Sequence, residues 1–121
     1  MSKMISLRLY FHHSAKGRPT RLWHRISRPG MARHLLAQAK LAGIEQALLH
    51  RVQAGFIRGD RIHHEHVEHL HHRFPQCIEL IDLEIKLRDF WQRHSGDLRD
   101  VHGVFLPCET AMHAAEEAIA I

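Results

Sequence analysis

The sequence predicts a single α+β domain over residues 1–121, with the ferredoxin-like element order β-α-β-β-α-β. Two segments with a helical spacing of apolar residues are each flanked by strand-like segments, and the chain length fits one domain with a modest core. Two β-α-β units of this kind form one antiparallel sheet with both helices on the same face. In that arrangement we expect the first strand to lie between the third and the fourth.

The first half of the chain supplies a strand, a helix and a second strand. Apolar and polar side chains alternate over residues 5–11, which is typical of a strand with one buried face. An apolar stripe at helical spacing then precedes Gly43, which stands where a C-terminal glycine cap belongs, so a helix is predicted over about 30–42. The short apolar run 47–52 predicts the second strand.

The second half supplies the other three elements after a polar connection over residues 55–75, a length that is usually functional or mobile. Residues 76–83 predict a central strand. Apolar residues at helical spacing predict an amphipathic helix over 84–95, and Asp82 is expected to cap its start. Residues 101–108 predict the last strand.

The sequence also indicates where the protein resides. No uninterrupted apolar run is long enough to cross a bilayer, and the first residues lack the features of a secretory signal, so we predict a cytoplasmic protein without membrane insertion. Cys77 and Cys108 form no CxxC pair and are expected to be buried, reduced thiols. Across the predicted sheet they would lie about 10 Å apart, too far for a disulfide. The alanine-rich tail 111–121 predicts a short terminal helix.

Basic residues are concentrated in the first third of the chain. Residues 1–44 carry nine Lys or Arg and no acid, whereas residues 45–121 hold all thirteen acids and eight basic residues. Such a distribution favours anionic partners such as nucleotide phosphates, although a solvated face that neutralises acids of the same fold explains it equally well. No recognised nucleic-acid-binding motif accompanies the charge, so nucleic acid is not predicted as the partner.

Four motifs occur in order along the chain: Arg51-Val52-Gln53-Ala54-Gly55-Phe56, Arg61-Ile62-His63, Pro75-Gln76-Cys77-Ile78-Glu79-Leu80-Ile81-Asp82 and Lys86-Leu87-Arg88-Asp89-Phe90. Together they resemble an uncharacterised family of P-II-like proteins, small bacterial relatives of the P-II nitrogen regulators, over roughly residues 30–106. The resemblance implies a ferredoxin-like protomer, a homotrimer, and small-molecule effectors bound in clefts between subunits.

The resemblance and the basic residues together predict a non-enzymatic signalling protein that binds a small anionic, nucleotide-like effector and contacts a partner protein through the loop 54–75. Basic side chains would supply charge, and glycine would let backbone amides approach a phosphate closely. The candidate effector-binding residues are Lys16, Arg18, Arg51, Gly55, Arg58 and Arg61. Surface arginines on a flexible loop are the alternative interpretation. No catalytic motif is present, so no catalytic residue is predicted.

Six histidines fall within residues 63–72, and histidine is the commonest metal ligand. If this segment is helical, several of its side chains share a face and could chelate a borderline metal such as zinc, nickel or copper. The candidate ligands are His63, His64, His66, His69 and His72. A divalent-metal-binding protein is therefore the alternative function. A solvated polar segment and a pH-sensing segment remain open as well.

Overall fold

The computed structural model describes residues 3–13, 30–65 and 73–111. Its main elements are β1 (Met4–His12), α1 (Met31–Leu41), β2 (Gln46–His50), β5 (Pro75–Leu83), α3 (Glu84–His94) and β6 (His102–Pro107). A two-residue strand pair, β3 (Ala54–Gly55) and β4 (His63–His64), lies between β2 and β5, and a short 3-10 turn, η2 (Ser95–Asp97), follows α3.

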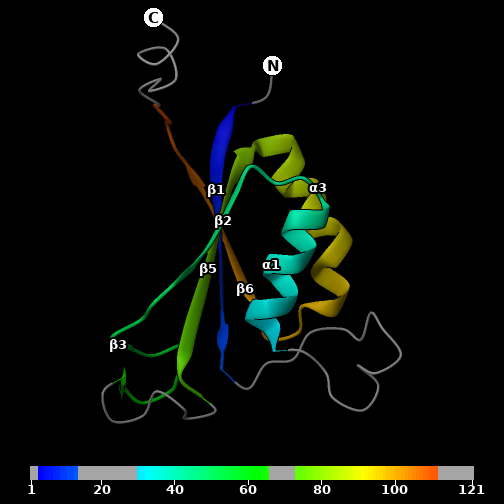
Figure 1. Cartoon of the computed structure of the whole chain (residues 1–121). Coiled ribbons are helices and arrows are strands. Elements are labelled where there is room, and N and C mark those ends of the chain that lie inside the picture. The colour runs from blue at the N-terminus through cyan, green and yellow to red at the C-terminus, as the bar shows by residue number, and fades with distance from the viewer. Residues whose placement is uncertain (1–2, 14–29, 66–72, 112–121) are drawn as a thin grey trace, which may run out of the picture.

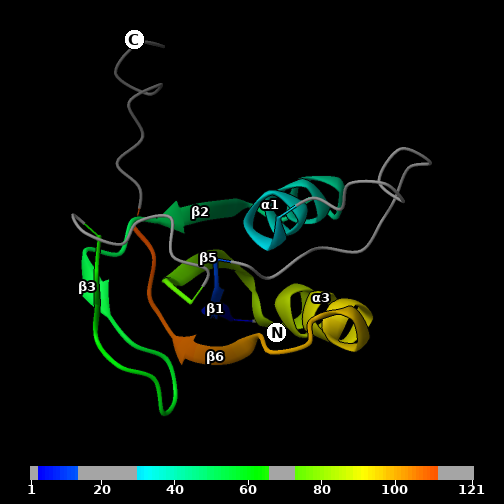
Figure 2. The same cartoon turned by 90° about the horizontal axis from the view of Figure 1, so that it is seen from below.

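The four longer strands form one antiparallel sheet in the order β2-β5-β1-β6. Both helices cover the same face of this sheet, and the opposite face carries no helix in the described part of the chain (Figures 1 and 2). The predicted α+β ferredoxin-like fold is therefore confirmed, including the position of the first strand between the third and fourth.

The core lies between the helices and the covered face of the sheet. Alternate residues of β1 from Ile5 to Phe11 are buried, which is the period-two pattern of a strand with one apolar face. The helices contribute Leu35 from α1 and Leu87 from α3, and both side chains are fully buried. The same alternation places Ser6, Arg8 and the other even-numbered β1 residues on the uncovered face.

Glycine ends the first helix as the sequence predicts. Gly43 has a φ of 72°, and its N–H donates to the carbonyl of Lys40 at 3.2 Å. The N–H of Ile44 donates to the carbonyl of Ala39 at 3.1 Å. These two bonds form a Schellman motif, in which glycine supplies the left-handed residue without a steric penalty.

Asp82 connects two elements and is not the cap residue of α3, which is Leu83. Its carboxylate accepts the backbone N–H of Leu83 at 2.6 Å and that of Glu45 at 2.7 Å, and lies 2.9 Å from Lys86 Nζ. Burial opposes ionisation of this carboxyl, but the hydrogen bonds outweigh it and lower the pKa of Asp82. The residue thus fixes the turn before β2 against the start of α3.

The connection 55–75 differs from the irregular segment that the sequence predicts. Ala54 pairs with His64 and Gly55 with His63, so a short hairpin forms within it. The second strand also ends at His50, two residues earlier than predicted. The predicted terminal helix over 111–121 falls almost entirely outside the described residues.

Both cysteines are free, and Cys77 is buried as predicted, whereas Cys108 is only partly buried. Cys77 pairs with Tyr10 of β1, whereas Pro107, the residue before Cys108, pairs with Ile5. They therefore lie at opposite ends of the sheet and farther apart than the predicted separation of about 10 Å, because each residue of a strand adds about 3.3 Å.

Candidate functional site

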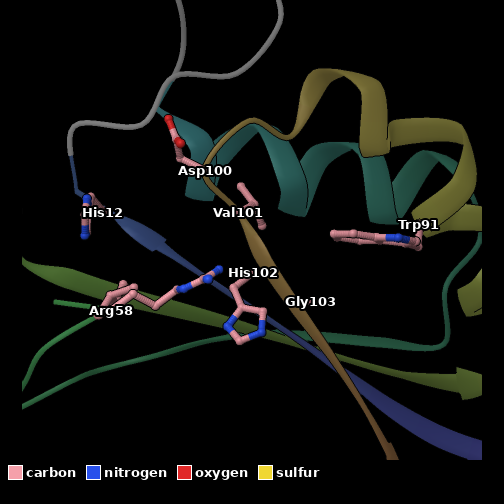
Figure 3. A pocket seen from close by; sticks show the side chains of 8 residues that line it. His12, Arg58, Trp91, Asp100, Val101, His102 and Gly103 are labelled. Atoms are coloured by element: carbon pink, nitrogen blue, oxygen red, sulfur yellow. The ribbon is translucent and has the colours of Figure 1, made fainter.

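A pocket of about 580 Å³ lies where the end of β1, the segment leading into β6 and the β3–β4 hairpin approach one another (Figure 3). Its polar lining comes from His12, Arg58, Asp100 and His102. Ile57, Trp91, Val101 and Gly103 complete the lining. The volume falls within the range of about 300–1,000 Å³ that is usual for small-molecule sites.

The hairpin positions Arg58 through a tight turn. The N–H of Asp60 donates to the carbonyl of Ile57 at 3.2 Å, and the two central residues, Arg58 and Gly59, have φ values of 26° and 77°. Two successive positive φ angles are typical of a type I′ hairpin turn, which glycine and asparagine favour. An arginine in this conformation costs roughly 1–2 kcal/mol, because its Cβ crowds the following carbonyl.

A buried carboxylate–imidazole pair closes the same hairpin. Asp60 Oδ2 lies 2.9 Å from His63 Nε2 and 3.5 Å from Arg73 Nε, and Asp60 Oδ1 accepts the N–H of Arg61 at 2.8 Å. The side chains of Asp60 and His63 are only 9% and 1% exposed. The hydrogen bond to His63, together with that from Arg61, lowers the pKa of Asp60. The pair therefore holds the turn that carries Arg58.

A second turn positions Asp100. The N–H of Val101 donates to the carbonyl of Leu98 at 3.2 Å, and Asp100 within this turn has a φ of 62°. Asp100 and Arg58 are the two non-glycine residues with positive φ in the described part of the chain, and both line the pocket. Backbone strain of this kind tends to cluster at functional sites.

The charged groups of the pocket are not neutralised by other residues of the described ranges. Among the described residues, neither Arg58 nor Asp100 has an ion-pair partner. Other described arginines do pair with carboxylates: Arg8 with Glu79, Arg51 with Glu65, Arg73 with Asp60, Arg88 with Glu84 and Arg93 with Asp89. In Figure 3 the Arg58 side chain extends toward His102. Two potential cations thus converge without an anion from the described residues between them.

His12 adds a further polar atom to this site. Its Nε2 is buried and has no hydrogen-bond partner among the residues that the structure describes. Buried polar atoms are almost always paired, so an unpaired one at a pocket requires an explanation. A ligand that occupies the pocket would provide it.

The predicted effector-binding residues are not gathered in one place. Arg58 lines the pocket of about 580 Å³, whereas Arg51 lines one of about 250 Å³ and binds both carboxylate oxygens of Glu65 at 2.8 Å. Gly55 pairs in β3, and Arg61 Nη1 donates to the carbonyl of Ile62 at 3.5 Å. Lys16 and Arg18 lie outside the described residues.

Three polar residues of the pocket were missed in the sequence prediction: His12, Asp100 and His102. A signal for two of them was available, because His12 continues the polar face of the alternating strand and His102 begins the last strand. Antiparallel pairing then aligns Tyr10 with His102, which brings the end of β1 to the start of β6. Asp100 has no comparable local signal.

The structure describes two of the predicted metal ligands. His63 is buried against Asp60, and His64 is exposed in β4. His66, His69 and His72 lie outside the described residues. Within the described ranges, no group of three or more His, Cys, Asp or Glu side chains could hold a metal ion. The metal site therefore stays a prediction.

A second polar cluster lies on the uncovered face of the sheet. Glu79 accepts hydrogen bonds from Ser6 Oγ at 2.6 Å and Arg8 Nε at 3.1 Å, and lies 2.9 Å from His50 Nε2. The bond from Ser6, assisted by Arg8 and His50, lowers the pKa of Glu79. These contacts join β1, β2 and β5 on the side away from the helices, so this face can be buried without leaving Glu79 unpaired.

None of the helices in the described ranges is both long and apolar enough to cross a membrane. Among protein families, the one described as "DUF190: Uncharacterized ACR, COG1993" matches residues 4–101. The matched region runs from β1 to the turn that carries Asp100, and so includes the hairpin. No curated protein matches the chain.

Proposed function

This chain belongs to the DUF190 family (Uncharacterized ACR, COG1993), and from that premise we propose that it is a P-II-like regulatory protein without enzymatic activity. It binds a small anionic, nucleotide-like effector. The effector site lies in the pocket beside the β3–β4 hairpin, and the loop 54–75 carries the signal to a partner protein. Effector binding would bias the position of this loop, as a ligand shifts the population of a two-state element.

One observation carries the proposal: Arg58 is held in a strained conformation with its side chain extended toward His102, in a pocket that His12 also lines, and no described carboxylate neutralises it. A guanidinium donates charge-assisted, often bidentate hydrogen bonds to phosphate or carboxylate groups. Protonated imidazoles would add donors to the same anion. An anionic effector at Arg58 would therefore supply the acceptor that the described protein does not provide for this guanidinium.

The strain at Arg58 supports a role in binding. Glycine or asparagine would fit this turn position better, so an arginine here lowers the stability of the fold. A loss of stability of this kind is expected where the side chain is needed for binding. The buried Asp60–His63 pair then keeps the turn, and with it the guanidinium, in place for the ligand.

We expect Arg58→Asn to weaken binding of inorganic phosphate or ATP about 10- to 100-fold, since a hydrogen bond to a charged group contributes about 1.5–3 kcal/mol. Asparagine tolerates positive φ, so the variant should unfold at the same or a slightly higher temperature. Arg58→Lys keeps the charge and should lose less affinity. Isothermal titration calorimetry and thermal melting measure the two quantities.

Arg33→Gln is the matched control for that experiment. Arg33 is exposed on α1 and does not line the pocket, so its removal changes the net charge without touching the site. Its affinity for phosphate should stay within about twofold of the unmodified protein, because exposed charges away from a site act weakly. Equal affinities for the unmodified protein and Arg58→Asn would refute the proposed site.

We further propose that the protein is a homotrimer whose subunits cover exposed apolar side chains. Phe56 and Ile62 on the hairpin are 58% and 55% exposed, and Leu48 on the edge strand is 48% exposed. Burial of such side chains against another chain is favourable, because it removes apolar surface from water. Light scattering after size exclusion should give three times the 14.1 kDa chain mass; a single-chain mass at all concentrations contradicts the trimer.

A further inference from the structure

We infer that Asp100 determines the specificity of the pocket, so that the effector is a phosphomonoester whose other end carries free hydroxyl groups. The inference rests on the proposed function, because it assigns a ligand class to the same site. Asp100 is acidic, alone among the described residues that line the pocket, and an anion-binding site by itself does not explain a carboxylate there.

A carboxylate in an anion site opposes binding unless the ligand also brings hydrogen-bond donors. Like charges at close range repel, and an ionised carboxylate can only accept hydrogen bonds. Asp100 lines the pocket with Arg58, and the two are not ion-paired with each other. Each therefore remains free to contact a different part of a bound molecule.

The two charged side chains are set apart within the pocket. Figure 3 shows Arg58 extending from the hairpin toward His102, whereas the Asp100 carboxylate points away from both of these side chains. The Asp100 carboxylate is therefore not directed at the side chains that would hold a phosphate at Arg58. A ligand that satisfies both needs its anionic group and its donors at different ends.

The space between the charges suits a larger molecule than an inorganic anion. The pocket holds about 580 Å³, and Ile57, Val101 and Trp91 give its lining an apolar component. Sites of this size typically bury an organic body and orient it with a few polar groups. A sugar phosphate with an attached ring, which is the chemistry of a nucleotide, matches this combination.

Neutral hydroxyl groups suit Asp100 better than a cationic group. Arg58 is always charged, and His12 and His102 become cationic on protonation, so a positively charged ligand group would be repelled by most of the site. Carboxylates accept hydrogen bonds from ribose hydroxyls in other nucleotide sites. Asp100 is therefore assigned to the hydroxyl end of the ligand.

Backbone geometry allows Asp100 to be tested without disturbing the fold. The residue has a φ of 62°, a conformation that asparagine and glycine also adopt readily. Asp100→Asn keeps the shape of the side chain and removes the charge, whereas Asp100→Gly removes the side chain altogether. Unchanged thermal melting would show that neither variant perturbs the turn.

The experiment compares AMP with 2′,3′-dideoxy-AMP and inorganic phosphate on the full chain by calorimetry. The unmodified protein should bind AMP at least about tenfold more tightly than the dideoxy compound, since the missing hydroxyls leave Asp100 without donors. Both Asp100 variants should bring this ratio below about threefold. Their affinity for inorganic phosphate should be unchanged or higher, because a repulsive charge is lost.

Different results would refute the proposed effector site and the role assigned to Asp100. If phosphate, AMP and dideoxy-AMP all fail to bind the unmodified protein, the proposed effector site itself is refuted. If they bind and the AMP to dideoxy-AMP ratio is the same in the unmodified protein and in both Asp100 variants, the assignment of Asp100 is overturned while the anion site stands.

Discussion

Replacing Leu35 by alanine should lower the free energy of unfolding by about 2–5 kcal/mol, the range found for large-to-small changes in a closed core. Leu35 is 0% exposed and packs from α1 onto the covered face of the sheet with Leu7 and Ile78. Truncation removes apolar contacts and leaves a cavity that the strands cannot fill, because their positions are fixed by pairing. Urea denaturation followed by circular dichroism measures the change.

Leu41→Ala is the control for this experiment on the same helix. Leu41 is the last residue of α1 and its side chain is 80% exposed, so the same chemical change should alter the free energy of unfolding by no more than about 0.5 kcal/mol. If the two variants lost equal stability, the core would not lie where the structure places it.

Sequence patterns were sufficient to predict the sheet and both helices, because each of these elements has its own periodicity. The alternation over residues 5–11 corresponds to the buried face of β1, and the stripe that includes Leu35 corresponds to the buried face of α1. The glycine after α1 was also predictable, since a left-handed cap selects for that residue.

The hairpin between β2 and β5 could not be predicted in this way. Its strands are two residues long and exist only because residues 54–55 pair with residues 63–64. Nothing in the local sequence separates the buried His63 from the exposed His64 beside it. The local indication of the contact between Asp60 and His63 is their three-residue spacing. That spacing can be interpreted only when the turn between them is known.

The candidate site could be predicted only in part, because some of its residues have a local sequence signal and others are brought together by the sheet topology. Arg58 belonged to the predicted basic set, because a glycine-containing loop with arginines is a recognisable anion-binding composition. His12, Asp100 and His102 come from two distant segments that the register of β1 with β6 brings together. Arg51 belonged to the same set, but Glu65 engages it. Such long-range neighbours follow from topology and have no local sequence signature.

Gly103→Val should cost about 1–3 kcal/mol of stability, the range for inserting a side chain into a packed region. A Cβ at this position would lie 2.9 Å from Trp91 Cζ3 and 3.0 Å from Cη2, closer than such atoms approach in proteins. The ring cannot easily turn away, because Trp91 packs edge-on against Phe105 with centroids 6.5 Å apart. Glycine within a strand often marks such a close approach. Thermal and urea denaturation would measure the loss.

Gly96→Ala and a Trp91 variant separate this clash from a general effect of losing glycine. Nothing lies within 4 Å of a Cβ added at Gly96, so alanine there should change stability by less than about 0.5 kcal/mol. In a Trp91→Ala background, Gly103→Val should lose most of its cost, because β-branched residues are favoured in strands once space exists. An equal cost in both backgrounds would mean that another contact excludes the side chain. Trp91 and Gly103 both line the pocket, so Gly103→Val in the otherwise unmodified protein should also weaken AMP binding.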